Sequence, residues 1–212
     1  MSSPTSPSSP TSPTLILASA SPRRRQLLEM LGLEVLVRPS HIPEAPLDGE
    51  APVAYAERLA RDKALAVPGD LVLGADTTVL LDGELLEKPV DAEDAVRMLR
   101  RLQGRTHEVI TSVALKSGGQ VRVATDVTRV TFRACDDDFL RAYVATGEPM
   151  DKAGAYGIQG YGAALVERIE GDFFGVMGLP VRLVLQLMEE AGVKYRFKPA
   201  SLSRLSQAAP GS

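Results

Sequence analysis

Several residue types are scarce in this chain of 212 residues, and each scarcity excludes a class of protein. The single cysteine, Cys135, cannot form an internal disulfide, so nothing points to an oxidising compartment. Two histidines and one cysteine are too few for a structural zinc site. Any bound metal should therefore be a hard cation, held by oxygen ligands such as carboxylates.

Long apolar runs and an excess of positive charge are also absent. No apolar stretch approaches the roughly 20 residues that a membrane span requires, and the first residues lack the charged start and hydrophobic block of a signal peptide. The chain has 24 Lys and Arg against 27 Asp and Glu, and the formal net charge of −3 disfavours a nucleic-acid-binding surface. We therefore expect a cytoplasmic protein that binds neither membranes nor nucleic acids.

The composition divides the chain into two tails and one folded region. Residues 1–13 are almost entirely Ser, Pro and Thr, and residues 199–212 have a similar character. Such segments have too little apolar surface to bury, so we expect both tails to be disordered. Residues 14–198 form a single expected domain, long enough to build a hydrophobic core without disulfides or metals.

Strand and helix signals alternate between the tails, which predicts an α/β fold with a mixed sheet covered by helices. Ser21 and Pro22 are a helix start signal that Gly32 ends, and Asp82-Gly83 is a hairpin signal. The expected strands are 15–18, 34–38, 71–75, 78–81, 106–116, 121–134, 164–169 and 193–197. The expected helices are 21–32, 52–67, 91–104, 136–147 and 180–191, with a Gly-rich loop at 148–162.

The first strand-to-helix turn, SASPRRRQLL, has an unusual charge distribution. Arg23, Arg24 and Arg25 occupy the first helical turn, where the helix dipole disfavours positive charge. A helix N-terminus offers free N–H groups to an anion, and the Ser19 and Ser21 hydroxyls with bidentate guanidinium groups would add to them. The turn is thus a candidate polyphosphate site, and the competing interpretation is a solvated basic patch.

Three further charged residues stand where a plain core or loop would not need them. Lys63 lies on the apolar stripe of an expected helix, so it either extends to the protein's edge or reaches a cleft. Asp76 interrupts the apolar run LVLGADTTVLL, so it either ends a strand or projects into a pocket at a strand end. A carboxylate there could deprotonate a water molecule beside bound phosphates. Lys88 precedes a proline and is either a phosphate contact or an ordinary loop lysine.

The segment DKAGAYGIQGYG places Asp151, Lys152 and Gln159 among four glycines. It lacks the spacing of a P-loop, which disfavours a Walker-type NTPase. Its glycines would allow the backbone to approach a base or sugar, and the Gln159 amide could read a base edge. The alternative is a plain surface loop.

His41 and His107 are expected to be structural, and Cys135 to be a packed thiol. Asp136–Asp138 are expected to stabilise a helix N-terminus.

Six stretches follow one another in a specific order: LILASASPRRRQLLEMLG, LARDKA, GADTTVLLDGELLEKP, LQGRTHEVITSV, GEPMDKAGAYGIQG and VERIEGDFFGVMGLP. Together they closely resemble the Maf family of nucleotide pyrophosphatases, and they cover nearly all of residues 14–190. The resemblance implies a two-lobed α/β fold of the Maf/ITPase-like kind, with a long mixed β-sheet flanked by helices and a nucleotide cleft. It also implies a homodimer.

The resemblance assigns expected roles to individual residues. Members of the family hydrolyse the α–β phosphoanhydride bond with a divalent cation, Mg²⁺ or Mn²⁺. By this comparison Asp76 is the proton acceptor, and Arg23, Thr77 and Gln159 influence substrate choice. The positions associated with phosphate and metal handling are Ser21, Arg24, Glu44, Lys63 and Lys88, with Lys63 and Lys88 expected in catalysis and Glu44 and Asp76 at the metal.

The loop DKAGAYGIQG resembles the branch that prefers dTTP and UTP rather than the branch that takes 7-methyl-GTP. The expected activity is hydrolysis of a pyrimidine nucleoside triphosphate, standard or modified, to the monophosphate and pyrophosphate. Nucleotide-pool sanitation and cell-division arrest are the implied cellular roles. Two rivals stay open: a nucleotide-sensing regulator of septum formation without significant catalysis, and a phosphatase that removes the terminal phosphate.

Overall fold

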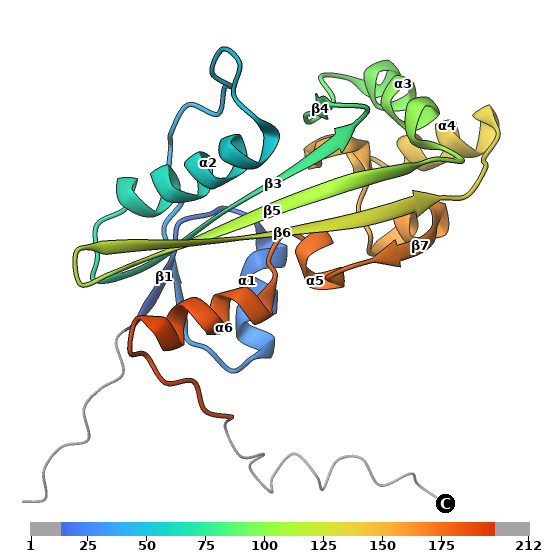
Figure 1. The fold of residues 1–212 in the computed structure, drawn as a ribbon. Coiled ribbons are helices and arrows are strands. Elements are labelled where there is room, and N and C mark those ends of the chain that lie inside the picture. The colour runs from blue at the N-terminus through green and yellow to red at the C-terminus, as the bar shows by residue number, and fades with distance from the viewer. Residues whose placement is uncertain (1–13, 198–212) are drawn as a thin grey trace, which may run out of the picture.

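The structure is a computed structural model that describes residues 14–197, so both expected tails lie outside the described residues. Its strands form one mixed sheet in the order β2-β1-β3-β5-β6-β7, with β4 paired to β3 (Figure 1). The helices pack on the sheet in two groups, one that includes α2 and α6 and one that includes α3 and α4. The strands are β1 (Leu15–Leu17), β2 (Val35–Val37), β3 (Leu71–Leu81), β4 (Glu84–Leu86), β5 (Thr106–Ser117), β6 (Gln120–Phe132) and β7 (Val166–Glu170).

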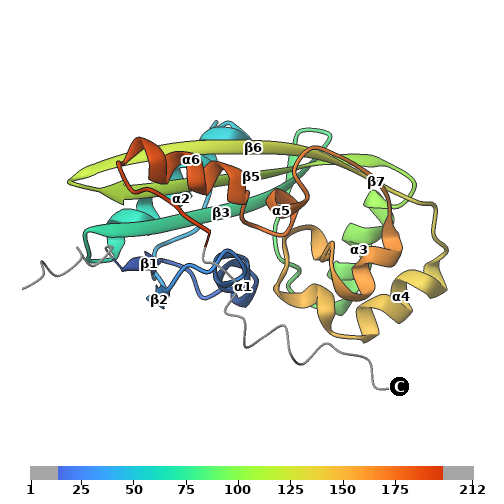
Figure 2. The same cartoon turned by 90° about the horizontal axis from the view of Figure 1, so that it is seen from below.

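The helices belong to two lobes that share the three long strands β3, β5 and β6 (Figure 2). None of the helices in the described part of the chain has the length and hydropathy that a bilayer crossing requires. The α-helices are α1 (Pro22–Met30), α2 (Pro52–Ala66), α3 (Ala92–Leu102), α4 (Asp137–Ala145), α5 (Phe173–Val176) and α6 (Val181–Glu190). The short 3₁₀ helices are η1 (Glu148–Asp151), η2 (Ala153–Ala155) and η3 (Gly160–Leu165).

Each lobe has its own hydrophobic core, and β3 contributes to both. Because side chains alternate along a strand, Leu71, Leu73 and Ala75 share one face of β3 and pack with β1, α1 and α6. Val79 and Leu81 continue the same face but pack with α3 and α4. Thr77 lies between these two groups on the strand, at the boundary between the lobes.

One edge of β3 is open between the lobes. On this edge the parallel partner β1 pairs only as far as Leu73, and the antiparallel partner β4 pairs only from Val79 onward. Within residues 14–197 no strand pairs with this edge of β3 between those two positions. The backbone and side chains around Asp76 and Thr77 are therefore accessible through a gap in the sheet.

The structure confirms most expected elements and corrects three. The strands expected at 71–75 and 78–81 are one strand, because the Asp76 carboxylate is paired and does not end it. The expected strand 193–197 is absent; instead the Tyr195 hydroxyl donates to the Leu31 carbonyl and anchors this segment beside α1. The loop 148–162 contains helices η1 and η2 and the start of η3. The Asp82-Gly83 hairpin is confirmed, with both residues at positive φ.

Helix α2 approaches β3 most closely at Gly74. A Cβ atom at this position would lie 2.7 Å from the Ala64 nitrogen and overlap the Ala60 carbonyl oxygen. Only glycine therefore lets α2 pack at its observed height above the strand, and this height determines where the side chains of α2 meet those of β3.

We expect Gly74→Ala to lower the free energy of unfolding by about 1–3 kcal/mol, the usual cost of overpacking. Chemical denaturation measures it, with Ala54→Ser on the exposed face of α2 as the control. An unchanged denaturation midpoint in Gly74→Ala would contradict this close approach.

His107 is buried among aromatic residues, which confirms its structural assignment. Its Nε2 lies 2.8 Å from the Tyr156 hydroxyl, and its ring packs edge-on against Phe132. Nδ1 is buried without a hydrogen-bond partner in the described structure. Burial lowers the pKa of His107 to about 4, so the folded protein keeps this side chain neutral at neutral pH.

This burial predicts a loss of stability in mild acid. The unfolded chain binds a proton at His107 below about pH 6.5, whereas the folded chain binds it only below about pH 4. The stability of the folded state therefore falls as the pH drops through this window. We expect His107 to account for about 2 kcal/mol of the stability lost between pH 7 and pH 5. His107→Gln, measured by urea unfolding at both pH values, should reduce the difference by this amount. An equal pH dependence in both proteins would rule out this contribution.

Candidate active site

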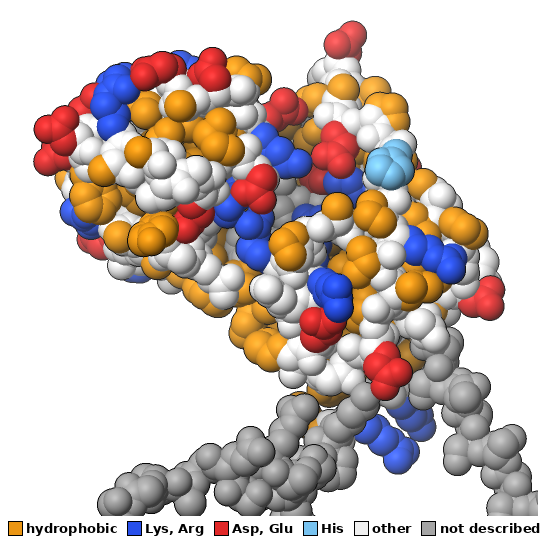
Figure 3. Space-filling view, turned by 180° about the vertical axis from the view of Figure 1, so that it is seen from behind, with side chains coloured by type: hydrophobic (Ala, Val, Ile, Leu, Met, Phe, Trp, Pro, Cys, Tyr) orange, Lys and Arg blue, Asp and Glu red, His pale blue; other side chains and the backbone are white. Residues whose placement is uncertain are grey.

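A cavity of about 630 Å³ opens at the gap in the sheet, between the two lobes. Its walls come from the β1–α1 turn, the loop before α2, the middle of β3, the loop after β4, and the segment from η1 to η3. The space-filling view shows Lys and Arg side chains gathered in a hollow between the lobes (Figure 3). All ten site residues expected from the sequence line this cavity: Ser19, Ser21, Arg23, Arg24, Glu44, Lys63, Asp76, Thr77, Lys88 and Gln159.

Lys63 is the centre of a charge cluster in the cavity. The side chain comes from the buried stripe of α2, and its ammonium group contacts Asp76 Oδ1 at 2.7 Å and Glu44 Oε1 at 2.8 Å. Both Lys63 and Asp76 are only 6% exposed. A buried charge is tolerated only when it is paired. Lys63 therefore does not extend to the protein's edge but reaches the cavity.

Asp76 lies in the middle of β3 rather than at a strand end, which corrects the sequence expectation. The neighbouring strands β1 and β4 do not extend to this position, so the cavity reaches Asp76 at the open edge of β3. Within the described residues Lys63 donates to Oδ1, and no donor reaches Oδ2. The carboxylate is thus fixed through one oxygen, while the other is available to a ligand or a water molecule.

Glu44 approaches the same ammonium from the loop before α2. Burial tends to raise the pKa of Glu44, but the hydrogen bond and charge of Lys63 outweigh it and lower the pKa. The Tyr55 hydroxyl donates to the Glu44 backbone carbonyl at 3.2 Å and holds the loop against α2. Burial raises the pKa of Tyr55 to about 12, so this hydroxyl keeps its proton.

The donor set of the cavity is compatible with a hard divalent cation. Glu44 and Asp76 both lie within 3 Å of the Lys63 nitrogen, so their carboxylates are close neighbours. Carboxylate oxygens suit Mg²⁺, which commonly takes one or two of them and completes its shell with water and phosphate oxygens. The described residues contain no group of three or more His, Cys, Asp or Glu that could hold a metal by itself. A cation here would therefore complete its shell with water or with substrate oxygens.

The N-terminus of α1 forms the wall beside this cluster. Ser21 caps the helix through its hydroxyl oxygen, which accepts from the Arg24 N–H. The Ser19 oxygen accepts from the Ser21 N–H at 3.2 Å and from Arg24 Nη1 at 3.0 Å. Because each oxygen acts as an acceptor within the turn, each hydroxyl proton can be donated to an anion in the cavity.

The three arginines of this turn differ in what they contact. Arg24 is held by protein acceptors: Nε donates to the Gly178 carbonyl, and Nη2 donates to the Thr77 hydroxyl at 3.1 Å. Nη1 donates to Ser19 and to the Ala75 carbonyl, a backbone group on the open edge of β3. Arg25 points away and pairs with Glu29 at 2.7 Å. Arg23 and Arg24 therefore line the cavity and Arg25 does not, and Arg24 also braces the cavity wall.

Two cations remain for a ligand at the cavity rim. Lys88 is exposed and makes no ion pair within the described part of the chain. Arg23 has only a long contact, 3.8 Å from Nη1 to Asp151 Oδ2. Neither side chain has a close carboxylate partner in the described structure, so both side chains can turn toward a polyphosphate.

Two further residues expected to influence substrate choice, Thr77 and Gln159, also line the cavity. The Thr77 oxygen accepts from Arg24 and lies 3.1 Å from the Thr111 oxygen, whose hydroxyl donates to the Gly175 carbonyl at 2.8 Å. Gln159 is exposed in the cavity wall, and its amide makes no hydrogen bond to any described residue. The amide is thus free to contact a ligand.

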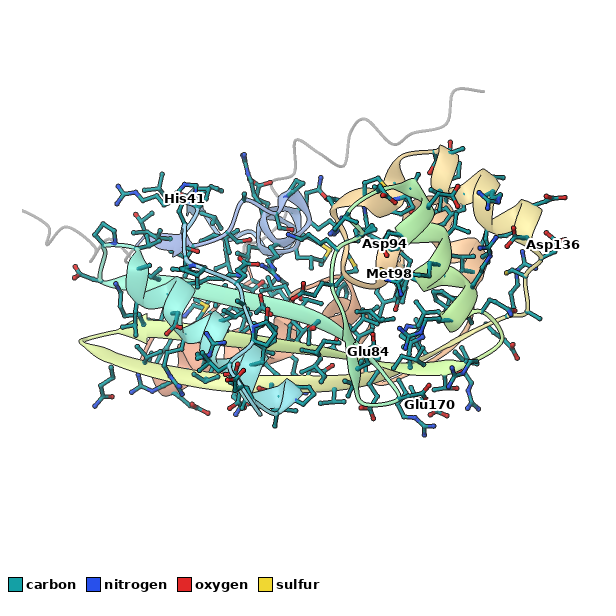
Figure 4. The ribbon with its side chains drawn as sticks, turned by 90° about the horizontal axis from the view of Figure 1, so that it is seen from above. His41, Glu84, Asp94, Met98, Asp136 and Glu170 are labelled. Atoms are coloured by element: carbon teal, nitrogen blue, oxygen red, sulfur yellow. The ribbon has the colours of Figure 1, made fainter. Side chains whose placement is uncertain are left out.

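Several cavity residues were missed by sequence reasoning. His41 is exposed at the cavity rather than structural, and Figure 4 places it in the lobe of α2, away from Asp94 and Asp136 in the other lobe. Glu148 and Tyr156 line the opposite wall. The only sequence signal was the position of Tyr156 in the segment DKAGAYGIQGYG and of Glu148 just before it.

This fold and site define a class of protein: a two-lobed α/β protein whose inter-lobe cavity joins cationic side chains to a fixed carboxylate. The sequence profile of a family described as "Maf-like protein" matches residues 14–191. The chain belongs to this family.

Relatives named dTTP/UTP pyrophosphatase are similar over most of their length. A protein of Koribacter versatilis named dTTP/UTP pyrophosphatase is 53% identical over 183 residues, covering 84% of this chain and 95% of the relative. A Chromobacterium violaceum protein of the same name is 50% identical over 187 residues, covering 84% and 94%. A Geobacter metallireducens protein, also so named, is 49% identical over 184 residues, covering 84% and 96%.

The contacts of Arg24 and Lys88 predict different mutant phenotypes. Arg24→Ala should lower the free energy of unfolding by about 2–4 kcal/mol, because the Gly178 and Ala75 carbonyls lose their donor. Lys88→Ala should leave stability unchanged and weaken the binding of inorganic tripolyphosphate about tenfold, the loss of one charged contact. Thermal unfolding and calorimetry measure the two effects, with Arg25→Ala as the control for both. Full stability in Arg24→Ala would show that the brace is dispensable.

Proposed function

We propose that this chain is a nucleoside triphosphate pyrophosphatase that hydrolyses dTTP and UTP to the monophosphate and pyrophosphate. The observation that carries the proposal is the fixed carboxylate of Asp76, open at Oδ2 and located among cationic groups in a cavity of suitable size. The names of the relatives support the reaction and the two substrates. A binding protein would need no such base.

In the proposed reaction Asp76 accepts a proton from a water molecule whose oxygen attacks the α-phosphorus. A new P–O bond forms to this oxygen, and the bond from the α-phosphorus to the bridging oxygen of the β-phosphate breaks. The bond electrons leave with pyrophosphate. Lys63 donates to Oδ1 and so keeps Oδ2 oriented as the acceptor. General-base assistance of this kind contributes about 10²–10⁴ in rate.

Charge stabilisation is the second requirement of the reaction, because the triphosphate is anionic and the leaving pyrophosphate gains charge. The N–H groups of α1, the Ser19 and Ser21 hydroxyls, and the Arg23 and Lys88 side chains surround the cavity on the phosphate side. Donors fixed by the fold act on the developing charge without reorganising during the reaction.

We propose that Glu44 and Asp76 hold a divalent cation, Mg²⁺ or Mn²⁺, together with the phosphates. When bound, the ion would neutralise phosphate charge and polarise the α-phosphorus. A homodimer and a cytoplasmic location are part of the same proposal. They are supported by the family resemblance and by the single cysteine of the chain, respectively.

The decisive variant is Asp76→Asn. The amide keeps an oxygen for Lys63 but accepts no proton, so we expect kcat to fall about 10²–10⁴-fold while nucleotide binding persists. Single-turnover release of pyrophosphate from dTTP with excess Mg²⁺ measures the effect, alongside direct binding. Asp70→Asn, an exposed carboxylate outside the cavity, should keep wild-type turnover.

The products distinguish this function from its rivals. The proposed enzyme forms dTMP and pyrophosphate, a terminal phosphatase forms dTDP and orthophosphate, and a nucleotide sensor forms neither. Turnover of Asp76→Asn within about threefold of wild type would exclude Asp76 as the base, and Glu44 would be the next residue to substitute.

A further inference from the structure

We infer that Glu148 is a positioning residue for nucleobase discrimination: its carboxylate holds the segment Gly157–Gly162 in the shape that presents Gln159 to the substrate base. The inference rests on the proposed function and adds to it the group that determines how the base is read. Glu148 itself lines the cavity from η1.

The Glu148 carboxylate accepts three hydrogen bonds, all from groups around this segment. Oε1 accepts from the Gly162 N–H and the Tyr143 hydroxyl, both at 2.9 Å, and Oε2 accepts from the Tyr161 N–H at 2.9 Å. The Tyr143 oxygen in turn accepts from the Gly157 N–H at 3.2 Å. Glu148 therefore holds both ends of the segment that contains Gln159, one directly and one through Tyr143.

The glycines of the segment are required by this arrangement. A Cβ at Gly160 would overlap Glu148 Oε2, and a Cβ at Gly162 would lie 2.7 Å from the Tyr143 hydroxyl oxygen. Gly160 also has φ +70°, a conformation that other residues rarely adopt. The backbone thus wraps tightly around one carboxylate, and Gln159 immediately precedes Gly160, one of these close approaches.

Glu148 keeps its negative charge in this environment. Burial tends to raise the pKa of Glu148, but the N–H groups of Gly162 and Tyr161 and the Tyr143 hydroxyl outweigh it and lower the pKa. Hydrogen bonds to a charged acceptor are stronger than those to a neutral one. An amide in place of the carboxylate would weaken these hydrogen bonds. Its NH₂ group would also face an N–H donor instead of accepting from it.

The segment that begins at Glu148 also contacts the second expected specificity residue. Lys152 donates to the Glu148 carbonyl and pairs with Asp151 at 2.6 Å, and Asp151 Oδ2 lies 3.8 Å from Arg23 Nη1. The carboxylate is therefore hydrogen-bonded directly to Tyr161 and Gly162, which follow Gln159 closely in the chain, and Glu148 is linked to Arg23 through the short 3₁₀ turn.

The test compares UTP with CTP, which differ only at N3 and position 4 of the base. We expect Glu148→Gln to reduce the ratio of kcat/KM for UTP over CTP about tenfold, mainly through KM for UTP, and Gln159→Ala to reduce it similarly. Since both substitutions remove the same recognition, the double variant should lose no more than either single one. Tyr143→Phe, a milder change that removes one donor to Glu148, should shift the ratio in the same direction.

Glu84→Gln is the matched control, because this exposed Glu pairs with Arg101 outside the cavity (Figure 4). It should keep the wild-type ratio. Unchanged selectivity in Glu148→Gln and Tyr143→Phe, with only a lower melting temperature, would overturn the inference, and so would additive losses in the double variant. Absence of UTP hydrolysis by the wild-type protein would instead refute the proposed function.

Discussion

The structure of the site depends on one buried ammonium group. Lys63 lies between two carboxylates from different parts of the chain, and its position is determined by how closely α2 packs on β3 at Gly74. Removing one partner of a buried ion pair is far more costly than the pair's net contribution, because the other charge remains uncompensated. The packing of α2 thus places Lys63, and Lys63 in turn orients Asp76 and lowers the pKa of Glu44.

Arg24 performs the corresponding role for the opposite wall. Its guanidinium joins α1, the open edge of β3 and the Gly178 loop, which are distant in sequence. The Arg24 guanidinium satisfies the Ala75 carbonyl, which no described strand reaches, and it also places positive charge in the cavity wall. Structural and electrostatic contributions of this arginine are consequently inseparable in a single substitution.

Local signals were sufficient for most of the fold but not for contacts between distant segments. Caps such as Ser21 and the turn at Asp82-Gly83 are encoded by adjacent residues, so these elements were predicted correctly. Asp76 appeared to interrupt a strand, since the partner that permits it lies on another element. The expected site residues were chosen by motif resemblance and by unusual charge placement, and all of them line one cavity. Glu148 escaped notice because its donors lie 13 and 14 residues further along the chain.

The three long strands shared by the lobes have a mechanical consequence. β3 and β5 pair continuously from Leu71 to Leu80, across the boundary where the cavity lies, and β5 pairs with β6 over its whole length. A hinge between the lobes would have to break this ladder of hydrogen bonds, so large rigid-body closure is disfavoured. Recognition must instead rely on a preorganised scaffold in which only side chains and short loops adjust, and this limits the entropy lost on binding.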